Sequence, residues 1–159
     1  MVLVAALMLL IAASACAQED VGGWDKAKWG MTRAELSKIY RIKKYEGDYQ
    51  GHGNRMFSMN PPKIRGTIFM LEFWFDGEGD AGKLIRVQLV GAPDGDRDEI
   101  FGMMVSKYGE PSDQDVVALG AKYIWNRGPT RIELTRIKSQ DKQVYKINYS
   151  CVSCGADKL

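Results

Sequence analysis

The sequence TIFMLEFWF-DGEGDAG-KLIRVQLVG occupies residues 67–91 and decides the predicted fold. Two runs rich in β-branched and aromatic residues flank a polar, glycine-rich loop at residues 76–82, which is the pattern of a β-hairpin. Strand side chains alternate between the two faces of a sheet. One face is therefore predicted to form the core, and it carries Phe69, Leu71, Phe73, Phe75, Ile85, Val87 and Leu89.

The opposite face of the first run is half apolar. It carries Ile68, Met70 and Trp74, interrupted by Glu72. Apolar patches with an aromatic anchor mark partner sites. We therefore predict a partner-binding surface at these four residues. The alternative is that residues 51–63, or the tryptophan-containing segment near the N-terminus, cover this face as a lid.

The amino-acid composition limits the kinds of protein to which this chain can belong. The chain has 159 residues, 45% of them hydrophobic and 26% charged, which suits one domain with a real core. A net charge of +2 gives no electrostatic case for binding nucleic acid or an anionic membrane surface.

The N-terminal stretch predicts export. Residues 2–17 carry no charge and end in small residues, and the apolar run is too short to span a bilayer comfortably. We expect a signal peptide at residues 1–17, followed by a single domain at residues 18–159. The alternative is a buried N-terminal core helix.

Two processing routes remain open. The residues before Gln18 fit the A-x-A rule of ordinary signal peptidase. Residues 13–16 resemble a lipobox, in which Cys16 would become a lipidated N-terminus. We expect a periplasmic or secreted protein, attached to a membrane only if Cys16 carries a lipid.

Two short helices are predicted. Thr32 and Glu35 form a capping box at the start of a helix over residues 33–40. Apolar residues at helical spacing predict a second helix over residues 100–108. Gly109, directly after it, suits the position that terminates a helix.

The remaining strands are predicted at residues 121–126, 130–138 and 143–151, with a lysine-containing edge strand within residues 41–50 and a loop at 51–63. Short turns favour antiparallel pairing. The sequence thus predicts an α+β domain: an antiparallel sheet of about six strands with two short helices on one face. A helix followed by three strands occurs twice in this order, which suggests a duplicated unit.

Several segments together resemble a family pattern. They are WGMTRAEL at residues 29–36, the Phe-Trp-Phe hairpin, KYGEP at 107–111, Trp125 and INY at 147–149. Over residues 24–150 the chain resembles uncharacterised exported bacterial proteins, similar in outline to the β-lactamase-inhibitor-like and barrel-assembly-lipoprotein-like folds. The resemblance implies a non-enzymatic envelope protein that binds other macromolecules, with an unknown protein or envelope component as partner. It transfers no catalytic residue.

Cys151 and Cys154 form the most specific chemical motif. Redox CxxC pairs place the first thiolate at a helix N-terminus, whereas this pair follows a predicted strand. A local disulfide that holds the C-terminal segment is the favoured interpretation. The alternative is a thiol-redox or metal-binding envelope protein that uses these two residues; His52 would still leave a zinc site one ligand short.

Other candidate sites are weaker. His52 with Met56 and Met59 suits copper by ligand type, but a surface loop explains the same residues. The acidic loops at residues 76–80 and 94–98 lack the glycine and glutamate positions of an EF-hand and are interpreted as solvated turns. We predict no cofactor, no metal and no enzymatic activity.

Overall fold

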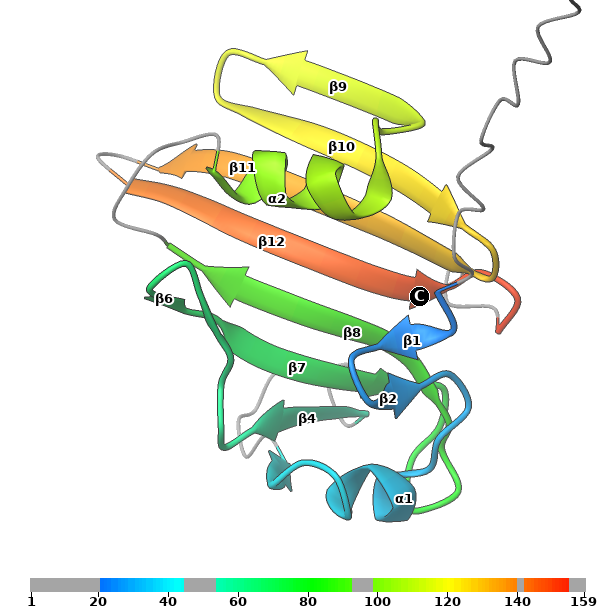
Figure 1. Ribbon diagram of the computed structural model, residues 1–159. Coiled ribbons are helices and arrows are strands. Elements are labelled where there is room, and N and C mark those ends of the chain that lie inside the picture. Colours follow the sequence, from blue (N-terminus) through cyan, green and yellow to red (C-terminus); the bar gives the residue numbers. More distant parts are fainter. Residues whose placement is uncertain (1–20, 45–53, 93–98, 140–141, 155–159) are drawn as a thin grey trace, which may run out of the picture.

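The computed structural model describes residues 21–44, 54–92, 99–139 and 142–154. Within them, eight strands form one antiparallel sheet in the order β3-β4-β7-β8-β12-β11-β10-β9 (Figure 1). Their bounds are β3 (Ile42–Lys44), β4 (Arg55–Ser58), β7 (Met70–Phe75), β8 (Leu84–Gly91), β9 (Asp113–Val117), β10 (Gly120–Arg127), β11 (Thr130–Ser139) and β12 (Lys142–Cys151). Two small hairpins lie outside this sheet: β1 (Gly23–Trp24) with β2 (Ala27–Lys28), and β5 (Lys63–Ile64) with β6 (Thr67–Ile68). The helices are α1 (Arg33–Ser37) and α2 (Glu99–Tyr108).

The two halves of the sheet follow the same plan. Each begins with a helix and continues with four sheet strands, which run from the sheet edge to its middle. The halves meet where β8 pairs with β12. The predicted helix-plus-three-strand unit is therefore corrected to four strands, and the predicted six-stranded sheet to eight.

One face of the sheet carries the core. Both helices and the β1–β2 hairpin lie on this covered face (Figure 1). Leu36 of α1 and Met104 of α2 join one hydrophobic cluster with Phe73 and Trp125, and all four side chains are 0–1% exposed. Burial of this apolar surface is the main source of stability.

The central hairpin is confirmed, with one correction to its core residues. The register shifts between Trp74, which pairs with Arg86, and Phe75, which pairs with Leu84. Leu84 therefore joins the core cluster, whereas Ile85 is buried outside it.

Phe69 lies between β6 and β7 and is fully buried. A Cβ atom added to Gly91 would lie 2.7 Å from a Phe69 ring atom. Glycine at the end of β8 thus makes room for this ring.

The predicted capping box is also present. The Thr32 hydroxyl oxygen accepts a hydrogen bond from the Glu35 amide at 3.2 Å, and the Thr32 amide donates to the Glu35 carboxylate at 2.8 Å. The helix is shorter than predicted and ends at Ser37. The turn after it is held by the Tyr40 amide, which donates to the Leu36 carbonyl.

Two strands of the large sheet were not predicted. β4 lies within the predicted loop at residues 51–63, and β9 is polar at its start and fully exposed. Both are short, and pairing with a neighbouring strand stabilises them more than their own composition does. β4 lies beside β7 in the plane of the sheet, so Arg55–Ser58 extend the sheet and do not form a lid over its second face.

Trp24 and Trp29 pack against the covered face, so this segment does not form the alternative lid either. Among the described residues, no helix is long and apolar enough to cross a membrane.

Candidate functional site on the open sheet face

The face opposite the helices, here called the open face, is built by alternate residues of the same strands. Gln88 alternates with core residues of β8, Asn148 with core residues of β12, and Glu133 with core residues of β11. Because strand side chains alternate, these three point away from the core, as Glu72 of β7 does.

Cross-strand register joins these residues into a row. Glu72 lies opposite Gln88, Gln88 opposite Asn148, and Asn148 opposite Glu133. We call these four residues the acid–amide row. It crosses the four central strands and brings together both halves of the chain.

Glu72 is the most buried member of this row, with 2% of its side chain exposed. Gln88 Nε2 donates a hydrogen bond to Glu72 Oε2 at 3.0 Å, and Arg55 Nη1 lies 3.4 Å from the same oxygen. The carboxylate is therefore paired with both an amide and a guanidinium, as a buried charge requires. At the neighbouring position, Asn148 Oδ1 is a buried atom for which the described residues supply no hydrogen-bond donor.

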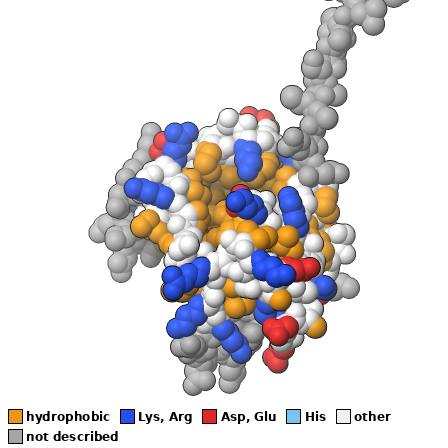
Figure 2. Space-filling model, turned by 60° about the horizontal axis from the view of Figure 1, so that its bottom comes forward, with side chains coloured by type: hydrophobic (Ala, Val, Ile, Leu, Met, Phe, Trp, Pro, Cys, Tyr) orange, Lys and Arg blue, Asp and Glu red, His pale blue; other side chains and the backbone are white. Residues whose placement is uncertain are grey.

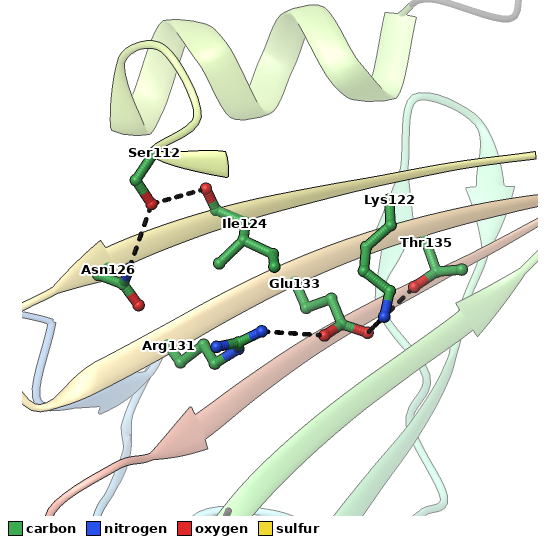
Figure 3. Close-up of polar contacts among 7 residues, drawn as sticks. All are labelled: Ser112, Lys122, Ile124, Asn126, Arg131, Glu133 and Thr135. Atoms are coloured by element: carbon green, nitrogen blue, oxygen red, sulfur yellow. Dashed lines mark hydrogen bonds and ion pairs between the residues drawn. The ribbon is translucent and has the colours of Figure 1, made fainter. Parts of the chain in front are cut away.

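Glu133 at the other end of the row lies between two cations. Figure 3 shows Arg131 and Lys122 approaching its carboxylate from two sides, at 3.9 Å and 4.0 Å. Thr135 Oγ1 donates a hydrogen bond to Glu133 Oε1 at 3.2 Å. Both ion pairs are long, and the Glu133 carboxylate stays partly exposed between the two cations.

A second row is rich in arginine and runs beside the first. Arg55, Trp74 and Arg86 lie opposite one another on β4, β7 and β8. The Arg55 and Arg86 guanidinium carbons are 5.2 Å and 5.7 Å from the Trp74 ring centroid. Both distances suit cation–π attraction, so Trp74 is held between two cations.

The charges of the open face are layered. At Glu133 the carboxylate side chain is 23% exposed, whereas those of Arg131 and Lys122 are 45% and 47% exposed. At Glu72 the carboxylate is 2% exposed and Arg55 is 14% exposed. In all three ion pairs the cationic side chain is more exposed than the carboxylate side chain. An approaching ligand therefore meets positive charge before negative charge.

Figure 2 shows how the cations are distributed on one side of the molecule, turned so that the bottom of Figure 1 comes forward. Lys and Arg side chains lie mostly singly among hydrophobic ones and do not form one continuous block. This view looks at the bottom and the helix-covered side of Figure 1, so it describes that side and not the open face.

The four predicted partner-binding residues separate into two groups. Met70, Glu72 and Trp74 share the open face of β7, and Met70 is 45% exposed. Ile68 is 65% exposed but belongs to the β5–β6 hairpin, where it pairs with Lys63. β7 begins at Met70, so Ile68 is not a residue of the large sheet.

Sequence reasoning missed most of the polar residues of this face. Arg86, Gln88, Glu133 and Asn148 each alternate with core residues, which is a signal visible in the sequence. Their alignment into rows depends on the pairing of β8 with β12, whose partners are far apart in the sequence. Alternation alone therefore could not identify them as neighbours.

Cys151 and Cys154 form a disulfide at the end of β12, with Cα atoms 5.3 Å apart. Cys151 is fully buried and Cys154 is exposed. The Val152 amide donates to the Pro129 carbonyl at 2.8 Å, which fixes the bridged turn against the end of the β10–β11 hairpin.

The other predicted site residues lie partly outside the described chain. Cys16, His52 and residues 94–98 fall there. Asp76 Oδ1 accepts a hydrogen bond from the Lys83 amide at 2.7 Å, which is the role of a turn residue. Among the described residues, no three His, Cys, Asp or Glu side chains form a group that could hold a metal ion.

Comparison with known proteins gives little further information. No family model matches the chain, and no curated protein matches it. A solved structure, a DUF4309 family protein (YjgB) from Bacillus subtilis, is similar at 11% sequence identity and a TM-score of 0.42, covering 76% of this chain and 78% of its own. At this level the likeness carries no argument about function.

Proposed function

We propose that this chain is an exported, non-enzymatic binding protein that docks an acidic segment of a partner protein on its open face. The layered charge of this face carries the proposal. Arg131 and Lys122 extend toward solvent while Glu133 lies between them. A carboxylate on a partner can reach the outer cations without first meeting Glu133 or Glu72.

Trp74 supplies an apolar anchor within this charged surface. It is half-buried between Arg55 and Arg86, and the exposed Met70 lies on the same strand face. Tryptophan and arginine are the side chains most often found at energetic hot spots of interfaces. The proposed partner segment therefore carries an apolar or aromatic side chain beside its carboxylates.

Two further parts of the proposal do not depend on the charges of the open face. Export is inferred from the uncharged residues 2–17, and lipidation of Cys16 is the alternative that would place the protein on a membrane. Descent of the two halves from one duplicated α+β unit is favoured by their matching element order. Both halves contribute strands to the open face.

A peptide-display selection on the immobilised protein tests the docking proposal. We expect enriched peptides to combine Asp or Glu with an aromatic or large aliphatic residue. The best peptide should bind about 10- to 30-fold more weakly to Trp74→Ser, since truncating a central anchor costs about 2 kcal/mol. Arg86→Glu should weaken binding similarly, and binding should decline as salt rises.

Ile68→Ser is the control, because Ile68 is an exposed apolar side chain that belongs to the separate β5–β6 hairpin and not to the large sheet. It should bind the peptide as the unmodified protein does. Enrichment of basic peptides, or equal affinity of Trp74→Ser, would contradict the proposal. Binding of vesicles that contain anionic lipid, with no peptide selected, would instead identify a lipid-binding surface and also overturn it.

A further inference from the structure

The two edges of the large sheet carry opposite charge. β9 has five exposed residues that include Asp113 and Asp115 and contain no lysine or arginine. β3 at the other edge contains Lys43 and Lys44 and follows Arg41. Edge strands offer outward backbone N–H and C=O groups that can pair with another strand. These edges are thus complementary in hydrogen bonding and in charge.

Strand direction permits the two edges to meet. Every neighbouring pair in the eight-stranded sheet is antiparallel, so the first and last strands of the order run in opposite directions. A second copy placed beside the first in the same orientation therefore brings its β9 antiparallel to β3. The same face of the sheet remains outward in both copies.

The charged residues also lie on matching faces. Lys43 lies opposite Phe57, which lies opposite Glu72 of the open face. Asp115 lies opposite Lys122, which is on the open face as well. Residues two apart share a face, so Asp113 lies on this face with Asp115.

One register pairs the opposite charges directly. If Lys43 lies opposite Asp113 of a second copy, Arg41 lies opposite Asp115 of that copy. On the covered face, Ile42 then lies diagonal to Val116, which is 61% exposed in the single chain. Opposite charges facing each other across a strand pair are stabilising, and like charges are destabilising.

We propose that β9 of one copy pairs with β3 of a second copy, so that this protein self-associates head to tail through a continuous antiparallel sheet. The contact is heterologous and leaves a free edge at each end, so assembly does not stop at two copies. β3 has three residues, and the contact is therefore short and the association weak and concentration-dependent. This proposal does not depend on docking at the open face.

Sedimentation velocity over a range of protein concentrations provides the test. The unmodified protein should form species that grow beyond the dimer as concentration rises. The double variant Asp113→Lys with Asp115→Lys, and the double variant Arg41→Asp with Lys43→Asp, should each associate at least about tenfold more weakly, because each replaces two attractive pairs by repulsive ones.

Sedimentation of a mixture of the two double variants is the decisive experiment. One variant has two basic edges and the other has two acidic edges, so an equimolar mixture should regain the association of the unmodified protein. Glu78→Lys with Asp80→Lys, which makes the same change of charge in the exposed loop between β7 and β8, is the matched control and should associate normally. Circular dichroism checks that every variant is folded.

Three results would each overturn the proposal. The unmodified protein could remain monomeric at every concentration, the edge variants could associate as it does, or the mixture could fail to recover association. A compact dimer that stops at two copies and persists in both variants would show a different interface and would overturn it as well.

Discussion

The covered face and the open face are made by the same strands, yet burial has a different meaning on each. Phe73 and Glu72 are neighbours in β7 and are both almost fully buried, at 0% and 2% exposure. Phe73 is buried by helices and core side chains, whereas Glu72 is buried by Arg55, Gln88 and their neighbours on the open face. Low exposure alone therefore does not identify a core residue.

The two kinds of burial differ in energetic origin. Apolar burial on the covered face contributes stability in proportion to area. A paired charge gains little net stability, because its desolvation offsets the attraction, but removal of one partner is costly. The open face can therefore change its chemistry with less effect on the fold, provided that Glu72 keeps its partners.

The largest expected effect is on the covered face. Phe73→Ala removes a fully buried ring and should lower the free energy of unfolding by about 3–5 kcal/mol in urea titration. Met70→Ala, on the same strand but 45% exposed, should change it by no more than about 0.5 kcal/mol. Similar losses in both variants would show that the faces are not distinguished as described.

Replacement of Glu72 should have an intermediate effect. Glu72→Ala leaves Arg55 and Gln88 without their carboxylate and should cost about 2 kcal/mol. Glu72→Gln keeps an acceptor for Gln88 and should cost less. If Glu72→Ala is as stable as the unmodified protein, the ion pair is not a structural element of the open face.

The smallest effect is expected where α1 begins. Thr32→Ala removes the N-cap hydroxyl and should cost about 1 kcal/mol, whereas Thr32→Ser should be close to neutral. The backbone and hydroxyl hydrogen bonds from Thr32 lower the pKa of Glu35 below its ordinary value of 4.5. A lowered pKa adds stability above pH 4.5, which is lost as pH falls through the lowered pKa.

Measurement of the free energy of unfolding at several acidic pH values checks the direction of this effect. The stability difference between the unmodified protein and Thr32→Ala should shrink as pH falls below 4.5. A difference that grows in acid would contradict the capping-box account.

The covered face was largely predictable from the sequence and the open face was not. Strong period-two patterns located β7, β8, β10, β11 and β12, because each buries one complete row of side chains. β4 and β9 lack such a row and depend on their neighbours in the sheet.

The candidate site was predicted only in part. Met70, Glu72 and Trp74 follow from alternation within one strand, whereas the break at Phe69, which puts Ile68 in the separate β5–β6 hairpin, has no local signal. Asn148 lies opposite Gln88 only because β12 pairs with β8 over a long sequence distance. Local pattern carries no information about such pairs.

The position of β12 has a consequence for the order in which the fold can form. β12 follows the other sheet strands in the sequence, yet it lies in the middle between β8 and β11. Until residues 142–151 have been made, β8 and β11 are both exposed edges and the two halves cannot join. Non-local pairing of this kind is slow to form. A chain that emerges from its N-terminus therefore cannot complete the eight-stranded sheet until β12 has been made.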